Sequence, residues 1–187
     1  MIKGLVLAGG KSSRFGQDKA LVLYQGMRFL ERGVSILESV GLKSIVVTRQ
    51  GADYPFLNCP VLYDKLPDQG PLGGIYTAMT VFKNTSFLIL TCDMPALTSQ
   101  TLQNLLNKHE PSRPLTFYST PDRAEQPFPG IYEPSLLAAV REKLKKNNLS
   151  MTALFRELPM KKAVEWKGEP DVFRNVNSKK DLEIVPS

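Results

Sequence analysis

LVLAGGKSSRFGQDKAL, residues 5 to 21, is an apolar stretch that ends in a glycine-rich turn carrying several cations. The pattern from Ile2 to Ala8 is typical of a buried β-strand. Apolar residues then recur at helical spacing from Phe29 to Val40, and Gly41 supplies a C-terminal stop. The opening of the chain therefore predicts a strand, a glycine-rich connection and a helix, which is the first unit of an alternating α/β fold.

The same alternation continues along the chain. Further strands are predicted at residues 44–48, 60–63, 86–91 and 114–119, with helices at about 74–82, after Thr98, at 134–146, after Ser150 and after Ser178. Residues 125–132 contain two prolines and a glycine, and we expect an irregular or edge strand there. Strand followed by helix predicts an α/β fold of three layers, with a mostly parallel sheet and helices on both faces.

Length and composition are consistent with one hydrophobic core. The chain has 187 residues, of which 42% are hydrophobic, and we expect a single domain over residues 1–187. It contains no window of about 18 uncharged apolar residues and no basic leader followed by an apolar run. We therefore expect a cytoplasmic protein with no membrane partner.

The net charge of +6 raises the question of whether the protein binds nucleic acid. The excess is spread evenly, with 10 basic and 7 acidic residues in positions 1–100 and 14 basic and 11 acidic residues in positions 101–187. Nucleic-acid modules concentrate cations on one face and often add aromatic platforms. We therefore expect no nucleic-acid partner, although a mildly positive surface attracts small polyanions.

The single histidine and the two cysteines show no pattern typical of metal binding or of a disulfide. His109 follows a polar helical segment and has no second histidine or cysteine near it, so a solvated histidine at a helix end is expected. Cys59 and Cys92 fit no metal-ligand spacing, and small buried apolar residues without a disulfide are expected.

Chemically active residue types gather where the predicted strands end. Gly9 and Gly10 follow the first strand, Thr48 ends the second, and Asp64 and Asp93 follow the third and fourth. Open α/β sheets bind ligands outside the carboxyl ends of their strands. These residues are therefore expected to line one rim of the sheet.

The glycine-rich turn suits an anion, because residues without a Cβ let backbone N–H groups approach a phosphate closely. Arg14 and Lys19 can neutralise further charge. The P-loop pattern fails, because Leu5 occupies the position of its first glycine, and the dinucleotide fingerprint also fails. Spacing alone leaves phosphate binding and a plain tight connection both open.

Asp93 directly follows the apolar strand and precedes Met94 and Pro95. A carboxylate at this rim could join Mg²⁺ to phosphates, or it could simply turn the chain before the proline. Asp64 has the same two interpretations. A pair of acids could also hydrolyse sugars, but the adjacent cations and glycines favour phosphate chemistry.

The motif L-A-G-G-x-S-x-R-x-G-x-D-K-x-L at residues 7–21 resembles the opening motif of the molybdenum cofactor guanylyltransferases (MobA-type proteins). Other segments follow in the order of that family, so the resemblance covers nearly the whole chain. They are GPLGGI at 70–75 after Asp64, CDMP at 92–95, QPFPGIY at 126–132 and FRNVNSKKDL at 173–182.

The resemblance implies a Rossmann-like nucleotidyltransferase fold and an enzyme that uses GTP and Mg²⁺ to deliver GMP to the terminal phosphate of molybdopterin. It implies nucleotide contacts by Leu7, Ala8, Gly9, Gly10, Lys19, Thr48, Asp64 and Asp93. It implies catalytic roles for Arg14, Lys19 and Asp93, with Asp93 holding the metal, and pterin contacts by Asn175 and Asn177. Thr48 stands where the family usually has asparagine.

The expected partners are GTP and molybdopterin, and the protein is expected to be a monomer that contacts other cofactor-biosynthesis proteins transiently. Two alternatives stay open at this point. One is a related nucleotidyltransferase that uses CTP or acts on a sugar phosphate. The other is an adapter that binds a nucleotide without turnover.

Overall fold

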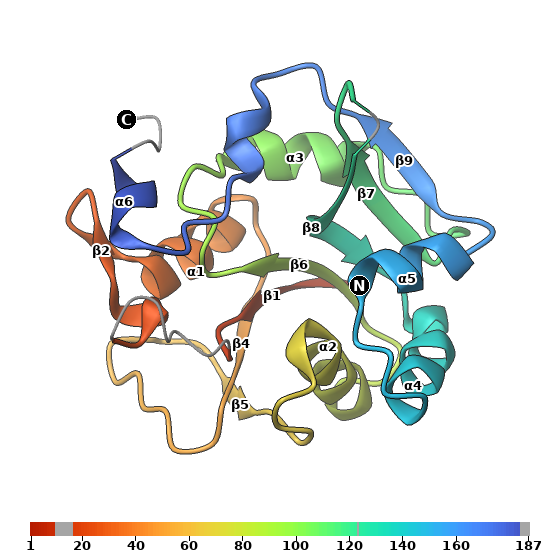
Figure 1. Cartoon of the computed structure of the whole chain (residues 1–187), viewed down its shortest axis with the longest axis horizontal. Helices are drawn as coiled ribbons and strands as arrows, with labels where there is room; N and C mark the ends of the chain where they lie inside the picture. Colours follow the sequence, from red (N-terminus) through yellow and green to blue (C-terminus); the bar gives the residue numbers. More distant parts are fainter. Residues whose placement is uncertain (10–16, 123, 184–187) are drawn as a thin grey trace.

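A sheet of seven strands organises the computed structural model, which describes residues 1–9, 17–122 and 124–183. The strand order is β5-β4-β1-β6-β8-β7-β9 (Figure 1). The strands are β1 (Ile2–Leu7), β4 (Ser44–Thr48), β5 (Val61–Tyr63), β6 (Ser86–Thr91), β7 (Leu115–Ser119), β8 (Glu125–Tyr132) and β9 (Lys162–Glu165). The first four in the spatial order are parallel, β8 is antiparallel to both its neighbours, and β9 is parallel to β7.

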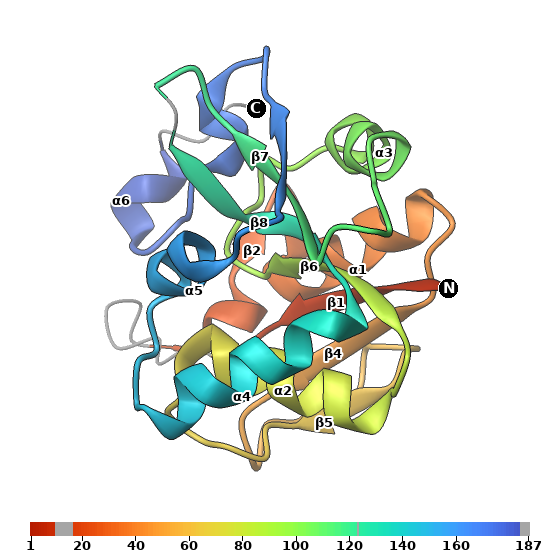
Figure 2. The ribbon, with the colours of Figure 1, turned by 90° about the vertical axis from the view of Figure 1, so that its right-hand side faces the viewer.

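Helices cover both faces of this sheet. In Figure 1, α3 lies above the sheet and α2 and α4 lie below it, and Figure 2 shows β1, β4 and β6 side by side. The α-helices are α1 (Phe29–Ser39), α2 (Gly70–Val81), α3 (Ser99–Asn107), α4 (Leu137–Lys145), α5 (Met151–Glu157) and α6 (Lys179–Leu182). The predicted three-layer α/β fold with a mostly parallel sheet is confirmed.

Short elements connect the layers. They are the hairpin of β2 (Leu23–Tyr24) and β3 (Met27–Arg28) and the 3₁₀ turns η1 (Lys19–Leu21), η2 (Pro134–Leu136) and η3 (Pro170–Phe173). No helix in the described part of the chain combines the length and the hydrophobicity that crossing a bilayer requires.

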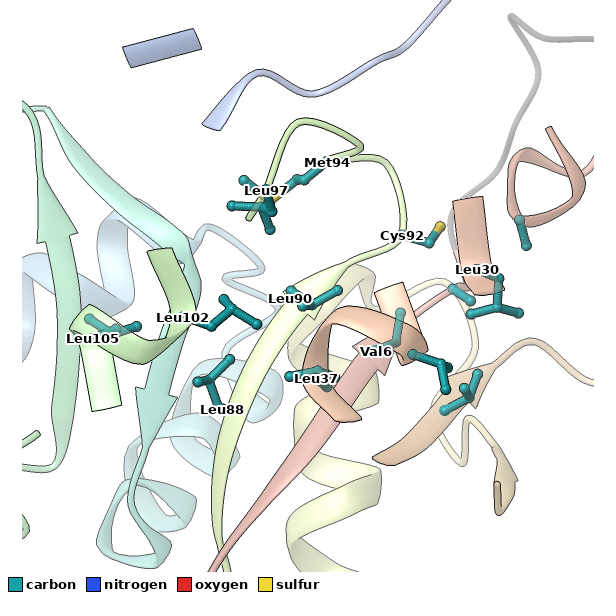
Figure 3. Close-up of a cluster of buried hydrophobic side chains, with 14 of the residues drawn as sticks. Val6, Leu30, Leu37, Leu88, Leu90, Cys92, Met94, Leu97, Leu102 and Leu105 are labelled. Atoms are coloured by element: carbon teal, nitrogen blue, oxygen red, sulfur yellow. The ribbon is translucent and has the colours of Figure 1, made fainter. Parts of the chain in front are cut away.

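Alternate residues of the central strands point to opposite faces and create two cores. Val6, Leu88 and Leu90 pack with α1 and α3 (Figure 3). Leu5 and Ile89 pack on the other face with α2, α4 and α5. All five side chains are almost completely buried, so the apolar runs read in the sequence are strands covered on both sides.

Several local predictions are confirmed by hydrogen bonds. Thr98 accepts from the backbone N–H of Thr101 at the start of α3, and Ser150 accepts from that of Ala153 at the start of α5. Helix α2 begins at Gly70, four residues before the predicted start, because Pro71 is accepted in the first turn, where a helix needs no backbone N–H.

For residues 125–132 the predicted irregular strand is confirmed, and the alternative of an edge strand is wrong. These residues form β8, which is an interior strand between β6 and β7. Its pairing with β7 passes from Gln126 directly to Gly130, so Pro127 and Pro129 lie where the ladder is interrupted. A proline lacks the N–H that a ladder requires, and an irregularity lets a central strand include it.

The prediction of a solvated His109 is also wrong. Its imidazole lies beyond the end of α3, with 10% of the side chain exposed, and its Nε2 is 2.8 Å from Oε1 of Glu133. The other oxygen of Glu133 accepts from Oγ of Ser86 at 2.8 Å. The carboxylate follows β8 in sequence, so the sheet topology delivers the partner that the neighbouring sequence lacks.

We expect Glu133→Ala to lower the free energy of unfolding by about 2–4 kcal/mol, because two buried donors lose their acceptor together. Glu133→Gln keeps an acceptor oxygen and should cost less. Urea titration of both variants measures the difference. A loss below about 0.5 kcal/mol for Glu133→Ala, within the range of ordinary surface substitutions, would contradict the assigned role.

Candidate nucleotide site

A cavity of about 400 Å³ lies at the carboxyl ends of β1, β4, β5 and β6. Backbone hydrogen bonds hold these strand ends level with one another: the N–H of Ala8 donates to Val47 at 2.8 Å, and that of Asp64 donates to Thr48 at 2.7 Å. The chain runs from β1 outward to β5 and returns to β6 on the other side of β1, so the cavity lies where the strand order reverses.

The cavity brings together seven of the residues that the sequence singles out. They are Leu7, Ala8, Gly9, Lys19, Thr48, Asp64 and Asp93. Gly10 and Arg14, which the sequence also singles out, lie outside the described residues.

Lys19 and Asp93 form the charged centre of the cavity. Nζ of Lys19 lies 2.9 Å from Oδ2 of Asp93 and donates to Oδ1 of Asn177 at 2.8 Å. Less than a fifth of either charged side chain is exposed. Strand β6, the turn η1 and the segment before α6 therefore converge on one ammonium group, which can move to a phosphate when one is present.

The second carboxylate oxygen of Asp93 is the clearest sign of a missing partner. Oδ1 is buried and has no hydrogen-bond donor among the described residues, although buried polar atoms almost always have one. An oxygen of this kind beside a cation and a cavity fits Mg²⁺, which commonly takes one or two carboxylates together with substrate phosphates. No group of three or more acidic, histidine or cysteine side chains suited to a metal occurs among the described residues, and Asp64 and Asp68 are the other carboxylates that line this cavity.

Asp64 is held firmly at the opposite wall. Its Oδ1 accepts from the backbone N–H of Leu66 at 2.9 Å and from Oγ1 of Thr77 at 3.0 Å. Its Oδ2 lies against Gly73, where a Cβ would come within 2.8 Å of both this oxygen and the carbonyl oxygen of Leu66. Helix α2 can approach Asp64 this closely because Gly73 has no side chain.

We expect Gly73→Ala to lower the free energy of unfolding by about 1–3 kcal/mol, because the new methyl group meets a fixed backbone oxygen. Gly74→Ala in the same helix is the matched control, since its Cβ meets the flexible tip of Leu7 and should cost less. Alanine is the better helix former at both positions. Chemical denaturation that finds Gly73→Ala more stable than the parent would contradict the steric role.

The C-terminal segment reaches the cavity through two neighbouring contacts. The N–H of Val176 donates to the carbonyl of Asp93 at 2.8 Å, and Asn177 accepts from Lys19. Asn175 and Asn177 are both exposed, and it is Asn177 that contacts Lys19 at the charged centre.

Thr48 and Cys92, which the sequence analysis also considers, have buried side chains at the cavity. The hydroxyl of Thr48 is directed to Oη of Tyr54 at 3.3 Å, and its side chain is fully buried. Cys92 lines the cavity, but burial raises the pKa of its thiol far above the usual value, so it stays a neutral apolar group. Cys92 is buried and unbridged as expected, whereas Cys59, also unbridged, is only partly buried.

Comparison with known proteins places this geometry in context. Residues 4–162 match the model of the MobA-like NTP transferase domain. A protein of Flavobacterium johnsoniae, named a probable molybdenum cofactor guanylyltransferase, is 30% identical over 177 residues, which cover 95% of this chain and 92% of that protein. A protein of the same name from Carboxydothermus hydrogenoformans is 36% identical over 146 residues, covering 77% of this chain and 73% of its own length.

A solved structure shares the fold. The molybdopterin-guanine dinucleotide biosynthesis protein A of Archaeoglobus fulgidus superposes with a TM-score of 0.81 at 19% identity, over 98% of this chain and 96% of that one. The arrangement of sheet and helices described above is therefore common to proteins whose sequences have diverged widely.

Proposed function

The chain belongs to the family of MobA-like NTP transferase domains, and on that premise we propose that it is a molybdenum cofactor guanylyltransferase. It transfers GMP from GTP to the terminal phosphate of molybdopterin and releases pyrophosphate. The observation that carries this proposal is the contact of Lys19 with Asp93 beside the end of β1, where the second oxygen of Asp93 has no hydrogen-bond partner in the part of the chain that the structure describes.

The proposed roles follow the walls of the cavity. Leu7, Ala8 and Gly9 contact the nucleotide through the backbone at the end of β1, and Asp64 binds the guanosine part. Lys19 contacts the phosphates, with Gly10 and Arg14 assisting there. Asn175 and Asn177 serve the pterin side, and residues 1–187 act as one nucleotidyltransferase domain. The cavity volume of about 400 Å³ lies within the range of small-molecule sites.

The transfer needs no covalent enzyme intermediate. An oxygen of the pterin phosphate, already ionised, forms a new bond to the α-phosphorus of GTP, and the bond between that phosphorus and the bridging oxygen of pyrophosphate breaks. The protein contributes alignment and charge neutralisation. Lys19 binds phosphate oxygens as negative charge moves toward the leaving group. Asp93 would hold Mg²⁺, which when bound neutralises phosphate charge.

Pyrophosphate release across the four nucleoside triphosphates tests the proposal. With molybdopterin and Mg²⁺ present, we expect release from GTP and little release from ATP, CTP or UTP. Release that prefers CTP, or that requires a sugar phosphate in place of molybdopterin, would identify a different nucleotidyltransferase. Binding of GTP without any release would identify an adapter.

A further inference from the structure

The residue before Lys19 carries more hydrogen bonds than a plain turn requires. Oδ1 of Asp18 accepts from the backbone N–H of Ala20 at 3.0 Å and so closes the turn η1. Its Oδ2 accepts from Oη of Tyr54 at 3.0 Å and from the guanidinium of Arg49 at 3.2 Å. The carboxylate is 15% exposed. One oxygen therefore shapes the turn that holds Lys19, and the other ties this turn to the segment that follows β4.

Tyr54 is the fixed end of this connection. It is 5% exposed, and its ring packs against Phe56 with a centroid distance of 5.9 Å. Burial raises the pKa of Tyr54 to about 12, so its hydroxyl keeps its proton at neutral pH and donates it to Asp18. The hydroxyl of Thr48 then donates to Tyr54 at 3.3 Å. The last residue of β4 is in this way linked to the turn of Lys19.

The ion pair with Arg49 contributes less. More than half of the Arg49 side chain is exposed, and an exposed ion pair is screened by solvent. The bond from the buried Tyr54 hydroxyl to a carboxylate is charge-assisted and protected from water, so it is the stronger anchor.

We propose that Asp18 is a positioning residue for Lys19, and that Tyr54, supported by Thr48, holds it in place. The inference rests on the proposed function, because it concerns where Lys19 stands when a triphosphate is bound. The tip of Lys19 meets Asp93 and Asn177 in this structure and must shift toward phosphate. The hydrogen bonds of Asp18 to Ala20 and Tyr54 keep the backbone of Lys19 in place, so its ammonium group can occupy only a small range of positions.

Tyr54→Phe tests the connection, because it removes the anchoring hydroxyl and leaves the bond from Asp18 to Ala20 intact. We expect kcat/KM for GTP to fall about tenfold, the scale of one hydrogen bond to a charged group. We also expect the amides of residues 20–22, which donate within the turn, to exchange hydrogen faster. Thr48→Val should speed the exchange of these amides less than Tyr54→Phe does, because it removes only the supporting hydroxyl.

Tyr118→Phe is the matched control. Tyr118 is also buried, its pKa is also raised to about 12, and its hydroxyl donates to the carbonyl of Thr101 at 2.7 Å, outside the cavity. It should lose stability but keep kcat/KM and the exchange rate of residues 20–22. Equal losses of kcat/KM in the two phenylalanine variants would overturn the proposal.

Unchanged exchange of residues 20–22 in Tyr54→Phe would overturn it as well. Hydrogen exchange needs no substrate, so it tests the link between Tyr54 and Asp18 even if the parent protein does not turn over GTP. Absence of GTP turnover by the parent would reject the proposed function and not this link. Should Tyr54→Phe fold poorly, Thr48→Val still gives the hydrogen-exchange readout, because it removes the hydroxyl that supports Tyr54.

Discussion

Asp93→Asn will lower Mg²⁺-dependent turnover of GTP by about 10²-fold or more, which is the scale of losing one electrostatic stabiliser in an active site. The substitution keeps the side-chain volume and an oxygen that can accept from Lys19, so the charge is the main property removed. The buried Oδ1, which has no partner within residues 1–9, 17–122 and 124–183, is the carboxylate oxygen that a cation would lose. The metal concentration needed for half-maximal rate should rise.

The measurement is pyrophosphate release as a function of Mg²⁺ concentration, for the parent and the variant. Asp171→Asn is the control, because Asp171 is ion-paired with Arg174 at 2.6 Å and lies outside the cavity. Its turnover should match that of the parent. Near-normal rates in Asp93→Asn would remove the central residue from the proposed mechanism.

Lys19→Gln should reduce kcat/KM for GTP by about 10²-fold, because a charge-assisted contact to phosphate is replaced by a neutral one. In Asp93→Asn we expect the main change in the Mg²⁺ concentration needed for half-maximal rate. In Lys19→Gln we expect it in the GTP concentration needed for half-maximal rate. The variant also leaves Asp93 without its cation in a place where each charged side chain is less than one-fifth exposed. A modest loss of stability is therefore expected as well.

Steady-state kinetics at varied GTP, with the midpoint of thermal unfolding measured in parallel, separates the two effects. Lys161→Gln is the control: its ammonium pairs with Glu125 at 2.6 Å, is 21% exposed and lies outside the cavity. If both lysine variants lose kcat/KM to the same extent, the loss reflects general destabilisation and Lys19 has no special part in binding phosphate.

Most residues of the candidate site could be predicted from the sequence, because the carboxyl ends of parallel strands lie at the same edge of the sheet. Apolar runs marked β1, β4 and β6 closely, and residues just beyond those runs must then share one rim. This reasoning placed Gly9, Thr48, Asp64 and Asp93 together, and all four line the cavity. Local periodicity and position sufficed, because both are properties of the nearest neighbours in the chain.

The errors share a different cause. The prolines of residues 125–132 predict an irregular or edge strand, and the structure has an interior strand whose irregularity accommodates both prolines. His109 seemed partnerless, yet Glu133 reaches it from the end of β8. Tyr54 carried no signal at all, although it lies within hydrogen-bond distance of both Asp18 and Thr48. Glu133 lies 24 positions from His109 and Tyr54 lies 36 positions from Asp18, so neighbouring residues do not reveal these contacts.

The sequence by itself determined the layers of this protein, the order of strand and helix, and the rim where ligand chemistry gathers. Hydrophobic periodicity, turn residues and helix caps act over a few residues, so they can be read without coordinates. Only the tertiary structure decided which side chains meet: Lys19 with Asp93 and Asn177, and Asp18 with Tyr54. Those contacts span 36 to 158 positions, and packing, which depends on the whole chain at once, brings them within 3 Å.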